Sequence, residues 1–190
     1  MKHEALLNPT RLYARAEVLA RPSPVPAESG VYAWYFRQVP PRVPTEGCIT
    51  AHGLTLLYVG ISPSEASARK DSRNPPQLRK RLRTHLRGKA STSTLRFTLG
   101  CLLSERLGIH LQRVRGRYTF AEGETLLNAW LDDNAFVCWL PTPQPWVVED
   151  ALIASTDLPL NLRGNERHPF FPQLRAVRQA ARDKANALVV

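Results

Sequence analysis

The sequence predicts an α/β or α+β domain in which a small central sheet of three strands, mixed or antiparallel, is flanked by helices. Three observations indicate this class. Two aromatic and β-branched stretches, 31–36 and 54–60, are joined by a loop and are expected to pair as an antiparallel hairpin. Several helical segments follow them. A third apolar stretch, 135–140, is typical of a buried strand and precedes a further helix.

Glycine and proline mark the ends of the expected helices. Gly88 and Gly108 each follow a helical stretch and are suited to stop it, whereas Pro145 is suited to a first helical turn. Helices are predicted over residues 76–87, 94–107, 124–133 and 145–155, with a terminal basic helix after Phe171. A short helix is expected within residues 1–21, and a short strand at 117–120.

The composition favours a polyanionic partner. The 190 residues include 26 Lys and Arg against 16 Asp and Glu, a formal net charge of +10. Because each neutralised phosphate releases counterions, an excess of this size favours nucleic acid. The three cysteines form no CxxC pair, and no stretch is apolar enough for a signal peptide or a membrane span. We therefore expect a cytoplasmic protein with no membrane partner.

The helix QLRKRLRTHLRG, residues 77–88, contains candidate phosphate ligands. Its leucines recur every fourth residue and predict the buried stripe. Arg81 and His85 lie four residues apart on the flank of that stripe. The other basic residues of the helix are predicted to contact DNA phosphates, with a solvated basic face as the alternative: Arg79, Lys80, Arg83 and Arg87.

A carboxylate and an amide follow in the last third of the chain. Glu149 lies in the first turns of the helix predicted from Pro145, where the helix dipole favours a negative charge. A lone carboxylate beside a polyanion suits a single Mg²⁺ or Mn²⁺, since Mg²⁺ combines few protein carboxylates with substrate oxygens and water. The later stretch LPLNLRGN supplies Asn161, expected to orient Glu149 and its turn, and Arg163, expected to bind DNA.

Two short motifs complete a pattern. Gly30-Val31-Tyr32 begins the first strand, and Tyr58-Val59-Gly60 ends the second. Together with Arg81 and His85, then Glu149, then Asn161, in this order, they resemble the GIY-YIG nuclease superfamily. The resemblance covers residues 28–165, and the 22 residues between Tyr58 and Arg81 are closer to the restriction-enzyme-like members. Residues 1–27 are then an N-terminal extension and linker, and residues 166–190 a basic helical extension.

This resemblance implies a bacterial endonuclease that hydrolyses DNA with one divalent cation, in defence or DNA processing. Glu149 would hold the metal, Arg81 would stabilise the phosphate, and the tyrosines would line the site. Tyr32, Tyr58 or His85 would take the proton from the attacking water. A histidine has a reference pKa near 6.5 and a tyrosine near 10, so His85 is the chemically simpler base and a tyrosine the usual one in the family.

Other functions fit the same composition. One is a non-catalytic nucleic-acid-binding module of the same fold, which predicts loss of the polar residues that this chain retains. Another is a basic RNA-associated or assembly protein in which those residues only pack. For the nuclease, sequence specificity is expected to come from the insertion after Tyr58 or from the terminal segments. Cleavage of both strands requires two sites or two sequential nicks, which admits a dimer on DNA.

Overall fold

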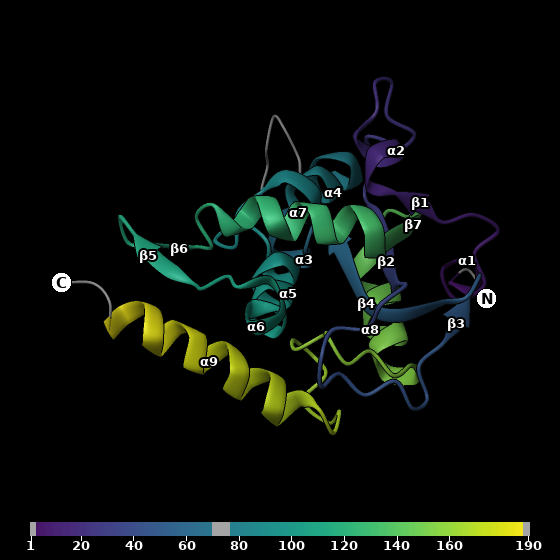
Figure 1. Cartoon of the computed structure of the whole chain (residues 1–190). Helices are drawn as coiled ribbons and strands as arrows, with labels where there is room; N and C mark the ends of the chain where they lie inside the picture. The colour runs from purple at the N-terminus through teal and green to yellow at the C-terminus, as the bar shows by residue number, and fades with distance from the viewer. Residues whose placement is uncertain (1–2, 70–76, 188–190) are drawn as a thin grey trace.

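A computed structural model describes residues 3–69 and 77–187 (Figure 1). One antiparallel sheet has the strand order β1-β7-β2-β4-β3. Its strands are β1 (Tyr13–Ala14), β2 (Gly30–Phe36), β3 (Thr50–Ala51), β4 (Leu54–Ser62) and β7 (Ala135–Pro141). The strands predicted at 31–36, 54–60 and 135–140 are confirmed as β2, β4 and β7, but the predicted number of three strands in this sheet is wrong. The two further strands have two residues each, too short to show an alternating pattern.

Helices surround this sheet, and a second, two-stranded sheet stands apart from it. The helices are α1 (Glu4–Leu7), α2 (Arg15–Leu19), α3 (Glu65–Ala68), α4 (Leu78–Arg87), α5 (Thr94–Leu102), α6 (Ser104–Leu107), α7 (Gly123–Asn134), α8 (Pro145–Ser155) and α9 (Phe171–Ala187). The second sheet is the hairpin of β5 (Gln112–Val114) and β6 (Arg117–Thr119). The predicted strand at 117–120 is therefore confirmed, whereas its short polar partner β5 was not predicted.

Two predicted helices are divided in the structure. The stretch 94–107 forms α5 and α6, which meet at Leu103. The short helix expected within residues 1–21 is wrong as one element, because α1 and α2 are separated by Pro9 and by β1. Residues 1–2, the predicted helix start at Pro76 and part of the insertion expected to give specificity (70–76) lie outside the described residues.

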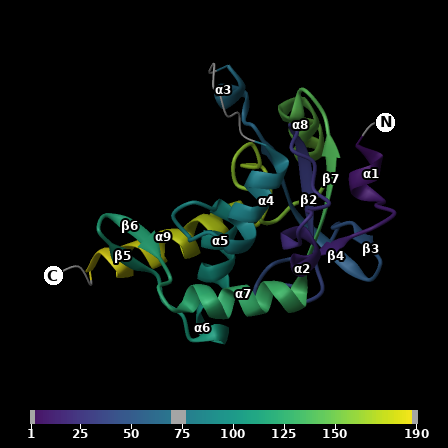
Figure 2. The ribbon, with the colours of Figure 1, turned by 90° about the horizontal axis from the view of Figure 1, so that it is seen from above.

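The sheet divides the core into two clusters. Val31, Ala33 and Tyr35 of β2 pack in a cluster with residues of α1 and α8. The alternate residues of β2 pack with α4, α5 and α7 on the opposite face. Figure 2 shows the sheet nearly edge-on, with α1 on one side and α4 and α5 on the other. The polar residues of interest must therefore meet at an end of this sheet, because both of its faces are covered.

A β-bulge in β4 decides which face its last residues occupy. Trp34 pairs with Tyr58, but the next residue of β2 pairs with Leu56, so Leu57 is the inserted residue. Such an insertion shifts the alternation of side chains by one. As a result, Tyr58 packs with the cluster that contains Tyr32, and not with the cluster that contains Leu56.

Both terminal segments pack on the central domain. In the N-terminal segment β1 pairs with β7, and Arg15 Nε donates to the carbonyl of Leu86 in α4 at 2.9 Å. At the other end α9 lies along α5 and reaches the β5–β6 hairpin (Figures 1 and 2). Within the described part of the chain, no helix has both the length and the apolar character needed to cross a membrane.

Candidate active site

A cleft of about 430 Å³ opens where β4 ends. Its wall combines residues of β2, β4, α3, α4, α5 and α8 with the loops that follow β4 and α8. The polar side chains in its lining are Tyr32, Tyr58, Ser62, Ser64, Ser67, Arg81, Thr94, Glu149, Asn161 and Arg163. The fold thus brings most of the candidate residues together. Among the candidate catalytic residues His85 is the exception, because it lies behind Tyr32 and does not line the cleft.

The outer edge of β4 explains the position of Asn161. β3 pairs with the first two residues of β4, and within residues 3–69 and 77–187 no strand pairs with the rest of this edge. The loop after α8 takes that place. Leu160 N donates to the Leu57 carbonyl at 3.1 Å, and the Asn161 amide both accepts from Val59 N and donates to Val59 O at 2.9 Å. Asn161 therefore acts as a neighbouring strand would, and among the described residues no hydrogen bond joins it to Glu149.

The two motif glycines are required by close packing. Gly60 lies directly across from Tyr32, and a Cβ atom at Gly60 would lie 2.6 Å from Tyr32 Oη. The second motif therefore makes room for the tyrosine of the first. A Cβ atom at Gly30 would clash with the backbone carbonyl oxygen of Leu140 and would lie 2.6 Å from Leu78 Cδ1, so this glycine allows both β7 and α4 to approach β2.

His85 is 1% exposed and bridges two hydroxyls. Its Nε2 shares a hydrogen bond of 2.7 Å with Tyr32 Oη, and its Nδ1 shares one of 2.7 Å with Ser93 Oγ. Burial holds the pKa of His85 well below its usual value, and the charges of Arg81 and Arg96 act in the same direction. The ring is therefore neutral near pH 7 and has one N–H. When that N–H donates to Ser93, Nε2 accepts the hydroxyl proton of Tyr32.

Both tyrosines of the cleft are neutral phenols. Burial raises the pKa of Tyr32, although Arg81 opposes the shift. Burial also raises the pKa of Tyr58 above its usual value. Neither hydroxyl is ionised near neutral pH, so a tyrosine that takes a proton from water must pass its own proton on at the same time.

Arg81 presents a positive charge to the cleft. Its Nε donates to Tyr32 Oη at 3.4 Å, and its Nη1 donates to the carbonyl of Thr92 at 3.3 Å. No carboxylate within residues 3–69 or 77–187 forms an ion pair with it. This guanidinium can therefore bind an anion in the cleft without breaking an existing ion pair.

Glu149 is the carboxylate of the cleft. Burial raises its pKa to about 7, against the opposing charge of Arg163. The described chain contains no group of three or more His, Cys, Asp or Glu side chains that could enclose a metal. One carboxylate is a poor set for Zn²⁺, which takes three or four protein ligands. It fits Mg²⁺ or Mn²⁺, which complete their coordination with water and phosphate oxygens.

Residues 30–180 match the family model described as the GIY-YIG catalytic domain. The chain belongs to the GIY-YIG family. The resemblance seen in the sequence is thereby confirmed, and the match extends past residue 165 into α9. The family consists of endonucleases, so at family level the chain is a nuclease. Searches of curated proteins and of solved structures gave no match to the chain.

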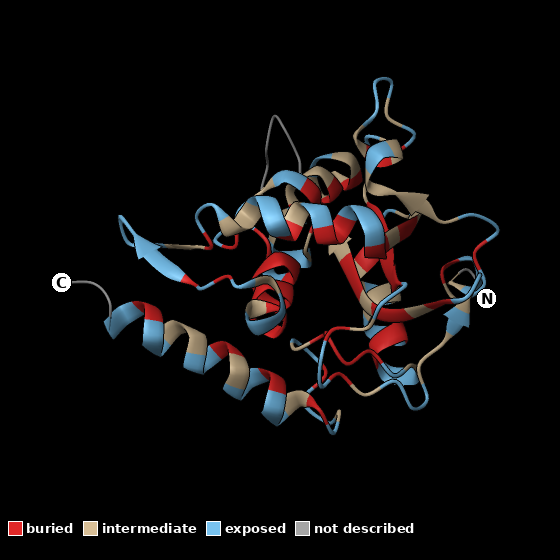
Figure 3. Cartoon of the chain, viewed as in Figure 1, coloured by how far each residue is buried: buried red, intermediate tan, exposed pale blue. Residues whose placement is uncertain are grey.

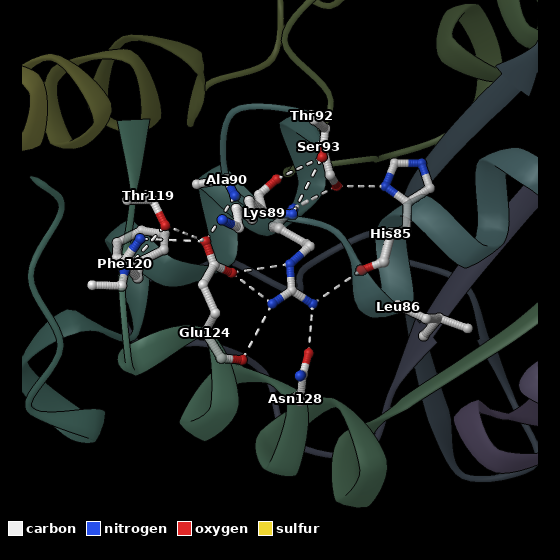
Figure 4. A network of polar contacts seen from close by, with 12 residues as sticks. His85, Leu86, Lys89, Ala90, Thr92, Ser93, Thr119, Phe120, Glu124 and Asn128 are labelled. Atoms are coloured by element: carbon white, nitrogen blue, oxygen red, sulfur yellow. Dashed lines mark hydrogen bonds and ion pairs between the residues drawn. The ribbon is translucent and has the colours of Figure 1, made fainter. Parts of the chain in front are cut away.

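A buried polar network supports the site of this GIY-YIG protein from behind (Figure 4). Arg96 is fully buried, and its Nη2 donates to Glu124 Oε2 at 2.6 Å. Its Nη1 donates to Asn128 Oδ1 at 2.8 Å and to the His85 carbonyl at 3.3 Å. The backbone N–H of Arg96 donates to Ser93 Oγ at 3.1 Å. The network therefore fixes the hydroxyl that His85 contacts.

This network was not among the features predicted from the sequence. The available signal was Arg96 itself, a lone charge within the otherwise apolar helix TLRFTLGCLL. A buried guanidinium needs hydrogen-bond acceptors, and a carboxylate is the strongest of them. That partner, Glu124, lies in α7, and nothing in the sequence selects it over other acidic residues.

The basic residues predicted to contact DNA are separated by the structure. Arg163 lines the cleft. Arg79 does not, because its Nε donates to the carbonyl of Val25 at 2.7 Å. Lys80, Arg83 and Arg87 also lie outside the cleft, on the flank of α4. DNA contact by these four α4 residues stays a prediction.

Proposed function

We propose that this GIY-YIG protein is a metal-dependent endonuclease that hydrolyses DNA phosphodiester bonds. The observation that supports it is the convergence on one cleft of a carboxylate, two phenols and a guanidinium that forms no ion pair with any described carboxylate: Glu149, Tyr32, Tyr58 and Arg81. These groups match the needs of phosphodiester hydrolysis, which are charge compensation on the phosphate and an acceptor for the proton of water.

Arg81 is proposed to bind the phosphate that is cut. Its planar guanidinium can donate two parallel hydrogen bonds to non-bridging oxygens, and this interaction strengthens as charge builds up in the transition state. Arg163 lies in the same cleft and would bind the flanking backbone. The formal net charge of +10 also attracts the negatively charged DNA to the protein before it binds in the cleft.

Glu149 is proposed to hold one Mg²⁺ or Mn²⁺. When bound, such a cation would neutralise charge on a phosphate oxygen and make a coordinated water more acidic. The raised pKa of Glu149 reflects the cost of burying its charge. A cation on this carboxylate would offset that cost, which supports Glu149 as the ligand.

Tyr32 is proposed to take the proton of the attacking water while its own proton passes to His85. The 2.7 Å contact between Tyr32 Oη and His85 Nε2 supports this path, and so does the neutral state of the ring. A direct role of His85 on water is less well supported, because the ring lies behind Tyr32 and does not line the cleft. Tyr58 is proposed to donate a hydrogen bond to a phosphate oxygen.

The experiment is incubation of supercoiled plasmid with the protein and Mg²⁺ or Mn²⁺. We expect nicking by the wild-type protein, and none with EDTA or in Glu149→Gln, which keeps the shape of the side chain. The matched control is Asp150→Asn, which changes the adjacent exposed carboxylate and is expected to retain nicking. Intact plasmid in every wild-type lane, over several DNA sequences, would refute the proposal and favour a non-catalytic binding module. Equal nicking by Glu149→Gln would indicate a contaminant.

The proton path is tested by pH–rate profiles of Tyr32→Phe, Tyr58→Phe and His85→Gln. We expect Tyr32→Phe to lose about 10²–10⁴-fold in rate, the range for general acid–base catalysis. His85→Gln should also be slow, since it cannot accept the proton as imidazole does. If Tyr32→Phe keeps near-wild-type activity while Tyr58→Phe loses it, the proton goes to Tyr58.

A further inference from the structure

The β5–β6 hairpin exposes three arginines that the cleft does not use. Arg115 and Gly116 form its tip with φ values of +50° and +75°, as a tight two-residue hairpin turn requires. Residues 112–117 are all exposed, and the hairpin projects from the body of the protein (Figure 3). In the described part of the chain no carboxylate forms an ion pair with Arg113, Arg115 or Arg117. Three like charges this close repel one another, and an anion bound beside them would reduce that repulsion.

One face of the hairpin is fixed to α9. Tyr118 Oη donates to Asn186 Oδ1 at 3.2 Å, and Arg113 Nη1 donates to the same oxygen at 3.4 Å. The Tyr118 ring also lies against Phe97, with ring centroids 6.1 Å apart. Because side chains alternate along a strand, Val114 and Arg117, which pair directly, share the opposite face. Val114 is 48% exposed there. The hairpin is thus an anchored ribbon with one face open to solvent.

A row of three arginines and one asparagine leads from the hairpin along α9. Arg175, Arg178, Arg182 and Asn186 recur at intervals of three or four residues, which places them on one flank of the helix. The guanidinium groups of Arg178 and Arg182 each lie 4.9 Å from the ring centroid of Phe97. Arg178 is 9% exposed, and no carboxylate among the described residues pairs with it. Arg178 is held inside the protein by Phe97 and Thr98, so the arginines of this row that are open to an anion are the exposed Arg175 and the half-buried Arg182.

This row begins beside the cleft. Arg178 Nη1 donates to Thr98 Oγ1 at 3.2 Å, and Thr98 lies one turn of α5 beyond Thr94, which lines the cleft. The charge of Arg178 also acts on the Tyr58 hydroxyl, where it opposes the rise in pKa caused by burial. Asn186 lies eight residues beyond Arg178, about 12 Å along the helix. Because the hairpin contacts Asn186, its anchored end lies roughly three to four base pairs from Arg178.

We propose that the β5–β6 hairpin is a duplex-binding arm, which with the α9 row holds double-stranded DNA beyond the phosphate in the cleft. This rests on the proposed nuclease function and specifies its substrate as duplex. The major groove of B-DNA admits a two-stranded ribbon, and the open face carries Gln112, Val114 and Arg117. Glutamine and arginine can bind base edges, and valine can contact a thymine methyl. Single strands instead stack on exposed aromatic rings, and the ring of Tyr118 is turned to Phe97.

The test compares affinity for a duplex of about 24 base pairs and for one of its strands, over a range of salt. All proteins contain Glu149→Gln, so that DNA is not cut. The arm variant is Arg113→Gln/Arg115→Gln/Arg117→Gln. The control, Arg11→Gln/Arg42→Gln/Arg106→Gln, removes the same charge from sites outside the arm. We expect the arm variant to bind duplex at least about tenfold more weakly, with a salt slope smaller by about 1 to 3, and the control to lose less than about threefold.

A further variant, Arg113→Lys/Arg115→Lys/Arg117→Lys, keeps the charges and should recover most of the affinity, which excludes misfolding as the cause of a loss. Equal losses of duplex affinity in the arm variant and the control would refute the proposal that the hairpin is a DNA-binding arm. Equal losses for duplex and single strand would overturn its preference for duplex. Nicking by the wild-type protein is scored separately. A wild-type protein that does not cut, with an arm variant that loses duplex affinity, refutes the nuclease and leaves the arm in place.

Discussion

Two arginines lie on either side of His85 and use their charge differently. Arg96 is fully buried, and its guanidinium donates to the Glu124 carboxylate and carbonyl, to Asn128 Oδ1 and to the His85 carbonyl. Arg81 borders the cleft, donates two longer bonds and has no carboxylate partner among the described residues. A charge that is neutralised inside the protein holds elements together. A charge left uncompensated beside a cleft is available to a ligand.

Removal of the buried Arg96 charge should have the largest effect, and this effect should be a loss of folding stability. Arg96→Leu leaves the carboxylate of Glu124 without its partner, and breaking a buried ion pair costs about 3–5 kcal/mol. The free energy of unfolding from urea denaturation would measure this loss. The double variant Arg96→Leu/Glu124→Leu should recover much of it, since no unpaired charge remains.

Arg11→Gln provides the control for that experiment, because its ion pair with Glu17 is exposed. It is expected to leave the urea midpoint unchanged. If Arg96→Leu matched this control, the buried network would have no structural role, and the contrast between the two arginines would be lost.

Loss of the cleft charge should instead act on the reaction. Arg81→Gln is expected to slow plasmid nicking by about 10²–10³-fold, as for removal of one preorganised transition-state donor. Its urea midpoint should stay near the wild-type value. Arg81→Lys should recover only part of the rate, because an ammonium cannot make the planar two-point contact. A large stability loss in Arg81→Gln with normal nicking would reverse the two roles.

The position of Tyr32 beside Arg81 depends on Gly60. A Cβ atom at Gly60 would lie 2.6 Å from Tyr32 Oη, so Gly60→Ala must displace the ring. We expect a loss of about 1–3 kcal/mol in unfolding free energy, as for overpacking, together with slower nicking. In a Tyr32→Leu background the same change should cost less. Additive effects in this double-mutant cycle would show that the two residues do not interact.

The smallest expected effect concerns His85, whose pKa burial lowers with help from both arginines. Below about pH 6.5 the unfolded chain binds a proton here that the folded protein does not. The free energy of unfolding therefore decreases as the pH falls below this value, with a slope of at most about 1.4 kcal/mol per pH unit, and His85 has no such effect above it. Glu149, with a pKa raised to about 7, contributes the opposite slope between about pH 4.5 and 7. The difference between wild type and His85→Asn isolates the histidine, and a constant difference from pH 7 to 5 would contradict the lowered pKa.

Local patterns in the sequence determined much of this protein. Aromatic and β-branched stretches predicted β2, β4 and β7, and glycine and proline marked most helix ends, because these signals depend on neighbouring residues. The order of the motifs from Gly30 to Asn161 indicated the GIY-YIG family, and most of these residues line one cleft. The basic surplus is likewise a property of composition alone.

The tertiary structure decided which groups face one another. Simple alternation along β4 would place Leu56 and Tyr58 on the same face, and only the inserted Leu57 turns Tyr58 towards Tyr32. The pairing of Asn161 with Val59 and of Arg96 with Glu124 joins segments distant in the chain. The burial of His85 and the anchoring of the β5–β6 hairpin on α9 likewise depend on contacts between separate elements. A single-residue change of register and a choice among distant partners leave no periodic signal, so packing alone determines them.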